Sequence, residues 1–224
     1  MALGCQKNRY EPIPNDIGHS YLPLKTGDIF IYKADSILYG FLGTKPNGDS
    51  ISFFIKEEVT YQLKDSNLTV YTLSRYHSKD STHWQFAKNH FYEVENLRIN
   101  HKENNSISTA LIFPILKNTY WNGHRFNNLA PKDYEYSMVN YSLKLNNTIY
   151  TNCVKVKMDS TLNFLQNIMA SNVYSKDCGL VFSESKNLLL INNDSLDKDG
   201  HVVLQRPPKI AKGTVFTKSL LYKR

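Results

Sequence analysis

Glu93 and Glu95 have the residue type and the spacing that glycoside hydrolysis requires. They alternate with Tyr92 and Val94, so in a strand both carboxylates point to one side, roughly 6.6–6.8 Å apart. Inverting glycosidases hold their acid and base at such a separation. Paired acids are also common on the solvated face of a strand, and we favour that interpretation. Glu57 interrupts an apolar strand face, so we expect it beside a basic partner or at a bulge, without a catalytic role.

The sequence lacks the motifs of other hydrolases and of common metal sites. It has no G-x-S-x-G segment, no H-E-x-x-H segment and no cysteine–histidine spacing typical of zinc. Its seven histidines are scattered: His19, His77, His83, His90, His101, His124 and His201. We therefore expect no catalytic residue, no cofactor and no metal ligand.

The segment from Trp121 to Phe126 is a polar and aromatic loop. Aromatic rings stack on sugars, and polar side chains beside them donate and accept hydrogen bonds. Trp121, Asn122, His124 and Arg125 are therefore a candidate ligand surface. The alternative is that the loop closes one end of a barrel.

Apolar residues with a period of two indicate the strands that would carry these groups. They occur from Ile51 to Leu63 and from Ile149 to Met158. Further strands are expected at 28–39, 68–77, 84–98, 107–116, 134–145, 172–183 and 214–222, separated by polar turns at 45–49, 64–67, 101–105 and 146–147. The pattern predicts an all-β fold, an antiparallel meander forming a curved sheet, half-barrel or barrel. At most one or two short helices are expected, at 131–134 and at 160–169, where another strand is the alternative.

The first residues resemble the processing site of bacterial lipoproteins. Gly4 precedes Cys5, although Ala2 and Leu3 stand in the reverse of the usual order, and no apolar stretch precedes them. The resemblance implies that Cys5 carries a lipid. We expect residues 1–19 to be a leash, because they contain prolines and polar residues without periodicity, and residues 20–224 to be a single β-rich domain. An ordinary frayed terminus with an incidental cysteine is the alternative.

The net charge of +7 is concentrated at the end of the chain. Residues 198–224 contain seven basic residues and one acid, which leaves 20 basic and 19 acidic residues before them. A basic tail could contact anionic lipid or polymer, but lysines on a solvated edge strand are the simpler reading. Without an aromatic–basic motif, nucleic-acid binding is not expected. The longest clear apolar run, from Ala110 to Leu116, is too short to cross a bilayer as a helix.

Several segments resemble uncharacterised exported lipoproteins of Bacteroidetes-type bacteria. Tyr21–Tyr32 is similar to their Y-x-P-L-x-x-G-x-x-W-x-Y opening, with Phe30 in place of Trp. Tyr174–Val181 is similar to a late Y-A-x-G-V-G-L-V motif, with Asp177 in place of Gly and Cys178 in place of Val. Shorter matches are Phe113-Pro114, Trp121-Asn122-Gly123 and 152–156. The resemblance implies a β-rich exported domain with no established activity.

Cys153 and Cys178 fall in two of the expected strands, about one hairpin apart. In an oxidising periplasm a disulfide between them is reasonable if their Cα atoms lie within about 7 Å. Two separate buried thiols are the alternative.

Together these features predict a non-enzymatic domain, lipid-anchored in the periplasm or at the outer membrane, that binds an unknown envelope ligand or protein. A lipid carrier or lipoprotein-trafficking half-barrel is one alternative. A glycan-active enzyme using Glu93 and Glu95 is another.

Overall fold

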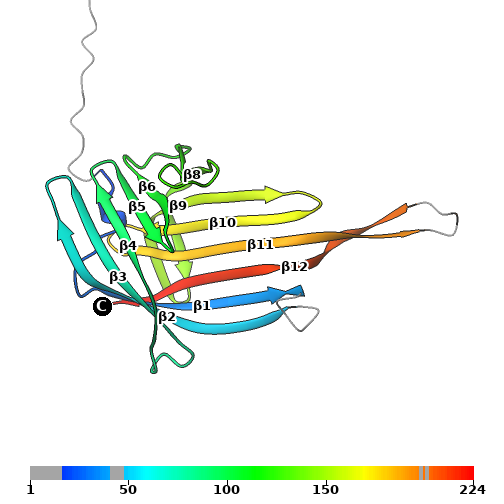
Figure 1. The fold of residues 1–224 in the computed structure, drawn as a ribbon, viewed down its shortest axis with the longest axis horizontal. Coiled ribbons are helices and arrows are strands. Elements are labelled where there is room, and N and C mark those ends of the chain that lie inside the picture. Colours follow the sequence, from blue (N-terminus) through cyan, green and yellow to red (C-terminus); the bar gives the residue numbers. More distant parts are fainter. Residues whose placement is uncertain (1–16, 41–47, 197–198, 200–201) are drawn as a thin grey trace, which may run out of the picture.

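The computed structural model describes residues 17–40, 48–196, 199 and 202–224. In this part of the chain a single antiparallel sheet of twelve strands curves into a nearly closed barrel (Figure 1). The strands are β1 (Ile29–Tyr39), β2 (Asp49–Lys64), β3 (Leu68–Ser78), β4 (Gln85–Glu95), β5 (Arg98–Glu103), β6 (Ser106–Ile112), β7 (Tyr120–Asn122), β8 (Asp133–Leu145), β9 (Thr148–Leu162), β10 (Gln166–Ser175), β11 (Gly179–Leu196) and β12 (Val202–Lys223). The all-β meander predicted from the sequence is confirmed.

The sheet consists of two six-stranded meanders. In the order β6-β5-β4-β3-β2-β1-β12-β11-β10-β9-β8-β7, every neighbouring pair is consecutive in sequence except β1 and β12. That central pair joins the first meander to the second, with Phe30 opposite Lys223 and Tyr39 opposite Gly213. The β11–β12 hairpin projects beyond the other strands (Figure 1).

The two outer strands, β6 and β7, do not pair in the ladder, and other hydrogen bonds connect their edges. The Tyr136 hydroxyl donates to the Ile112 carbonyl at 2.7 Å and accepts from the Ile112 amide at 2.9 Å. Trp121 Nε1 donates to the Thr109 carbonyl at 2.8 Å, and the Thr109 amide donates to the Gly123 carbonyl at 2.9 Å. These bonds provide partners for backbone N–H and C=O groups at the edge of the sheet that no neighbouring strand pairs.

One end of the barrel is filled by the segment that precedes β1. A short 3₁₀ helix, η1 (His19–Tyr21), leads to Leu22 and Leu24. The side chains of Tyr21, Leu22 and Leu24 belong to the hydrophobic core. The Asp177 amide donates to the Ser20 carbonyl at 2.7 Å, which ties the segment to the turn after β10. The opening motif that resembles exported lipoproteins is therefore largely a set of core residues.

Some element boundaries differ from those predicted. The expected strand 84–98 is divided into β4 and β5, and the expected turn 101–105 is a turn only at Asn104–Asn105. The expected strand 172–183 is interrupted by a turn at 176–178. Residues 160–169 belong to β9, β10 and the turn between them, and β8 begins at Asp133, so neither short helix forms. The described part of the chain contains no helix with the length and apolar character that a membrane span requires.

Candidate functional site: an internal cavity beside a buried ion network

A cavity of about 290 Å³ lies inside the barrel between the two meanders. One part of its wall is charged or polar and contains Arg75, His101, Glu103 and Lys218. Another part is apolar or aromatic and contains Ile55, Tyr134, Met158, Tyr174, Leu180 and Phe216. Ser108, Asn172 and Ser183 add hydroxyl and amide groups. Concave sites that combine apolar surface with a few converging polar groups are typical of small-molecule binding.

Glu57 is the centre of the ion network beside this cavity. It projects inward from β2, opposite Arg75 of β3, and Arg75 Nη2 lies 2.8 Å from Glu57 Oε1. Lys218 reaches the same oxygen from β12 at 3.2 Å, with its Nζ 4.5 Å from the centre of the Tyr32 ring. The prediction that Glu57 is buried beside a basic partner is confirmed, and two basic partners are present.

The charges of the network keep its carboxylates ionised. Burial alone would raise the pKa of Glu57, but the positive charges of Lys218 and Arg75 outweigh it and hold that pKa well below its usual range. Burial also opposes ionisation of Glu103, yet Arg75 and the hydrogen bond from Lys88 lower its pKa to about 2. Buried charges of this kind require such pairing.

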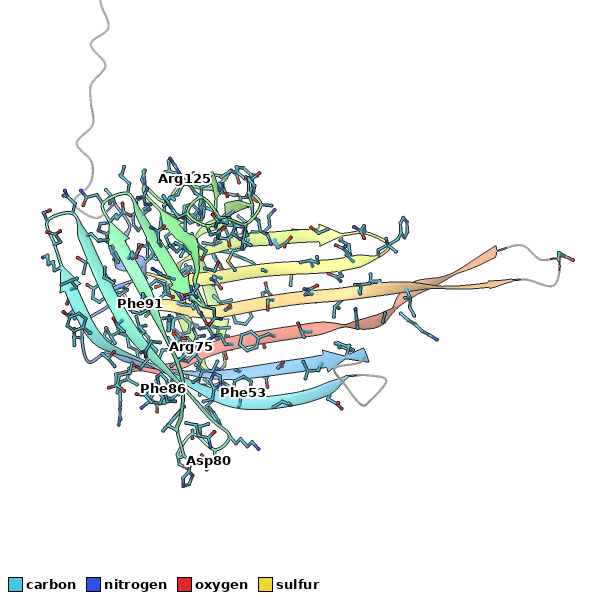
Figure 2. The ribbon with its side chains drawn as sticks, viewed as in Figure 1. Phe53, Arg75, Asp80, Phe86, Phe91 and Arg125 are labelled. Atoms are coloured by element: carbon cyan, nitrogen blue, oxygen red, sulfur yellow. The ribbon has the colours of Figure 1, made fainter. Side chains whose placement is uncertain are left out.

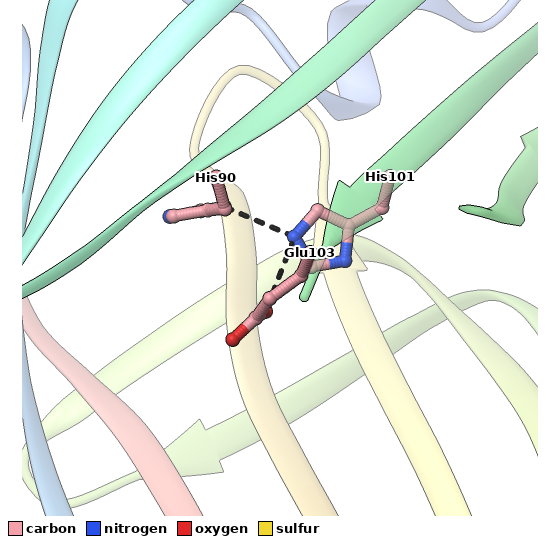
Figure 3. A group of neighbouring side chains, drawn as sticks. All are labelled: His90, His101 and Glu103. Atoms are coloured by element: carbon pink, nitrogen blue, oxygen red, sulfur yellow. Dashed lines mark hydrogen bonds and ion pairs between the residues drawn. The ribbon is translucent and has the colours of Figure 1, made fainter. Parts of the chain in front are cut away.

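His90 of β4 and His101 and Glu103 of β5 lie together next to this network (Figure 3). His90 Nδ1 is 3.0 Å from His101 Nε2, and His101 Nε2 is 3.5 Å from Glu103 Oε2. His101 and Glu103 are two residues apart on one strand, so both point to the same face. Tyr92 lies opposite His101 in the ladder, and their rings stack with centroids 4.7 Å apart.

Both imidazoles are neutral at neutral pH. Burial lowers the pKa of His90 to about 3, and Glu57 opposes that shift without cancelling it. Burial likewise lowers the pKa of His101 to about 4 against the charge of Glu103. A neutral imidazole keeps one nitrogen lone pair available to accept a hydrogen bond or to bind a metal.

The four residues of the candidate ligand surface do not meet in one place. Trp121 is buried at the edge of β6, and the Asn122 side-chain oxygen accepts from the amides of His124 and Lys132 at 3.0 and 3.1 Å. His124 Nδ1 is 2.9 Å from the Ala130 carbonyl and borders a groove outside the cavity. Arg125 is exposed among the loops on the opposite side of the molecule from Asp80 (Figure 2).

Glu93 and Glu95 lie on the other face of β4 from His90 and Tyr92, as the alternation along a strand requires. Glu95 is paired with Arg98, whose Nη2 lies 2.7 Å from Glu95 Oε2. The two carboxylates therefore stand apart from the internal cavity. His77 lies in β3, and His83 lies in the connection at 79–84 between β3 and β4.

The predicted disulfide between Cys153 and Cys178 is wrong for this structure, in which both cysteines are free thiols. Cys153 lies in β9 opposite Ser175 of β10, and its thiol donates to the Tyr150 carbonyl at 3.4 Å. Cys178 is three residues beyond Ser175, in the turn and not in the strand where it was expected. Cys5, the expected lipid attachment site, lies outside the described residues, as do most of the leash and residues 198, 200 and 201 of the basic tail.

The sequence alone did not indicate that five residues are neighbours in the structure: Arg75, His90, His101, Glu103 and Lys218. One signal was available, because His101 and Glu103 alternate as two residues on one strand face do. That signal was hidden by the polar run from His101 to Asn105, which resembles a turn throughout.

No family model and no curated protein matches this sequence. Among solved structures, one from Bacteroides fragilis, described as a "putative exported protein with YmcC-like fold", superposes with a TM-score of 0.52 and 7% identity, over 91% of this chain and 98% of that chain. Another, described as a "putative lipoprotein" from Parabacteroides distasonis, has a TM-score of 0.44 and 11% identity over the same shares of the two chains. At 7% identity, the first likeness shows that this chain shares the fold of the B. fragilis protein.

Proposed function

We propose that this protein is an exported, lipid-tethered domain of the cell envelope that holds a small polyhydroxylated ligand in its internal cavity and does not transform it. The observation that carries the proposal is the cavity of about 290 Å³, whose lining combines charged and hydroxyl groups with aromatic and apolar groups. Its volume is near the lower end of the range of about 300–1,000 Å³ that small-molecule sites occupy.

The pairing of the charges favours a neutral ligand. Arg75 is bound to both Glu57 and Glu103, and Lys218 to Glu57, so a fully charged ligand would have to displace one of these partners. Hydroxyl groups both donate and accept, and can join the network without breaking an ion pair. Sugar rings also present apolar faces, which fit the Tyr174 and Phe216 part of the wall.

The same network argues against a lipid carrier. An acyl chain in the cavity would remove water from Arg75, Glu103 and Lys218 without returning a hydrogen bond. Desolvation of charged groups without compensation is unfavourable.

The proposed location in the cell envelope depends on Cys5 and on the leash that follows it. The export attributed to the B. fragilis protein of the same fold supports it. The absence of catalysis is supported by the position of Glu93 and Glu95, which face away from the cavity.

The tether is tested by the denatured intact mass of the protein from its native membranes. We expect a chain that begins at Cys5 and carries diacylglycerol, since a lipoprotein signal is cleaved before the modified cysteine. A Cys5→Ser form is the control, and it should be unlipidated and released from the membrane fraction. An unmodified wild-type chain that retains Met1 would remove the tether from the proposal.

Ligand binding is tested by saturation-transfer NMR against neutral mono- and disaccharides. Ser183→Phe places a ring in the cavity, and we expect it to weaken sugar binding at least about 10-fold while the fold remains intact. Ser185→Phe is the matched control, because Ser185 lies two residues further along the same face of β11 and is exposed. Equal affinity in the two variants, or displacement of the sugar by a fatty acid, would contradict the proposal.

A further inference from the structure

The cluster of His90, His101 and Glu103 contains the donor atoms of a transition-metal site. One ligand atom from each residue can be chosen so that all three lie within 4.8 Å of one another (Figure 3). We propose that His90 Nδ1, His101 Nε2 and Glu103 Oε2 bind a divalent ion of the zinc class, with the fourth coordination position open to the cavity. This inference does not depend on the lipid tether or on the sugar ligand.

The distances suit tetrahedral coordination. Bonds of about 2.0–2.1 Å to nitrogen and oxygen place the ligand atoms of tetrahedral zinc roughly 3.3–3.4 Å apart. Two of the separations in the structure, 3.0 Å between the imidazole nitrogens and 3.5 Å from His101 Nε2 to Glu103 Oε2, lie on either side of that value. The third separation, from His90 to Glu103, is bounded by the 4.8 Å within which all three ligand atoms lie, so these two side chains must approach each other as the ion binds.

The surroundings of Glu103 orient its free oxygen. Oε1 is held by Arg75 Nη1 at 2.8 Å and by Lys88 Nζ at 2.5 Å. Oε2 is the oxygen that faces His101. Outer partners of this kind fix the geometry of a metal-binding carboxylate.

His90 supplies a second observation. Its ring is fully buried, and Nε2 has no hydrogen-bond partner, although Glu57 Oε1 lies 3.8 Å away. A proton on Nε2 points to that carboxylate and leaves the lone pair of Nδ1 directed to the cluster. An imidazole between a carboxylate and a metal is a recurrent arrangement in metalloproteins, because the carboxylate fixes the tautomer.

The neighbouring positive charges decide how the ion is accommodated. Arg75 and Lys218 form ion pairs with the buried Glu57, whereas the Lys88 side chain is about one third exposed and forms an ion pair with the far oxygen of Glu103. Lys88 is therefore the cation that can move into solvent when a divalent ion binds. Replacement of Lys88 by a neutral residue should therefore strengthen binding of the divalent ion. If the two histidines had only a structural role, this replacement would not affect ion binding.

The opening to the cavity determines the chemistry of the site. His101 and Glu103 both line the cavity wall, so water or a donor atom of a ligand can occupy the fourth position. Sites with three protein ligands and one open position bind exchangeable groups, in contrast to closed four-ligand structural sites.

The test is titration of the chelator-treated full-length chain with Co²⁺, followed by visible absorption, and with Zn²⁺, followed by calorimetry. We expect one equivalent to bind, with the comparatively intense visible d–d bands of four-coordinate Co²⁺ and no thiolate-to-cobalt charge-transfer band, because the donors are nitrogen and oxygen. His101→Gln should weaken binding by more than the roughly 10–100-fold that loss of an outer partner causes. His83→Gln, in the exposed turn after β3, should change nothing.

Lys88→Gln is a second, independent test of metal binding, which remains available if His101→Gln does not fold. Removal of one nearby screened charge should tighten Zn²⁺ binding about 5-fold. Unchanged or weaker binding in Lys88→Gln, full-strength binding in His101→Gln, or a sulfur charge-transfer band in the wild type would each overturn the proposal.

Discussion

Replacement of Glu57 by alanine is expected to lower the free energy of unfolding by about 3–5 kcal/mol. Arg75 and Lys218 have side chains only 13% and 10% exposed, and both lie against Glu57 Oε1. Without that carboxylate, Lys218 keeps a buried charge with no anion at hydrogen-bond distance, and Arg75 retains only Glu103. Urea unfolding of both proteins at pH 7 measures the difference.

Glu58→Ala is the matched control for this substitution. Glu58 is the next residue on β2, points to the opposite face, and pairs with Lys56 at 3.5 Å with its side chain 34% exposed. Exposed ion pairs contribute roughly 0–1 kcal/mol, so this variant should remain close to the wild type. Similar losses in the two variants would show that the buried network does not stabilise the barrel. Glu57→Met combined with Lys218→Met should recover part of the loss, since it removes both members of a pair.

Acidification from about pH 6.5 to about pH 4 is expected to destabilise the metal-free protein by several kcal/mol. The pKa values of His90 and His101 in the folded protein, about 3 and about 4, lie below the usual 6.5. The fold therefore opposes protonation of both rings, and stability is highest above about pH 6.5, where both rings are neutral in the folded and the unfolded chain. As the pH falls through this window, the unfolded chain gains protons that the folded chain does not. Each such proton changes the free energy by about 1.4 kcal/mol per pH unit. Glu103, with its pKa lowered to about 2, adds a further loss between about pH 4.5 and pH 2.

Urea unfolding at a series of pH values, with a chelator present, measures this dependence. His101→Asn removes one of the two groups and should reduce the slope between pH 6 and pH 4.5 by about half. His83→Asn should leave the slope unchanged, because His83 is exposed in a turn. The groups that face the pair are Glu57, Arg75, Lys88, Glu103 and Lys218, and none of them is substituted in this comparison. A flat profile, or an equal slope in His101→Asn, would contradict the prediction.

Strands β1–β4, β6, β8 and β9 were predictable from the sequence, whereas the second half of β5 was expected to be a turn. The segments from Ile51 to Leu63 and from Ile149 to Met158 alternate clearly, and both are strands. The outer halves of β11 and β12 were not predicted, because residues 184–196 and 202–213 are rich in polar residues and have no continuous apolar face. Residues 184–189 pair with β10 as well as with β12, and the β11–β12 pairing continues from there to Leu196 and Val202.

The candidate site was predictable only in part. A buried glutamate requires a positive partner, so the burial of Glu57 beside a cation followed from its place on an apolar face. The identity of the partner did not follow, because Lys218 lies 161 residues away and reaches Glu57 only through the β1–β12 pairing. His101 and Glu103 were assigned to a turn because their neighbours are Lys102, Asn104 and Asn105. Residue type alone does not separate a charged pair facing a cavity from a solvated loop.

The place of β1 and β12 in the sheet has a consequence for the order of folding. All other neighbouring strands are consecutive in the sequence, so they can pair locally. In contrast, β1 and β12 bring the two ends of the domain together, with the Ile29 amide donating to the Arg224 carbonyl at 3.0 Å and the Arg224 amide donating to the Ile29 carbonyl at 2.9 Å. Pairing over such a sequence separation has a large loop-closure entropy and is slow. Until the last strand has emerged from the ribosome or crossed a membrane, β1 and β11 are both unpaired edges, and the Lys218 partner of Glu57 is absent. The chain therefore completes its core last, and a truncated or stalled chain presents two open sheet edges to other proteins.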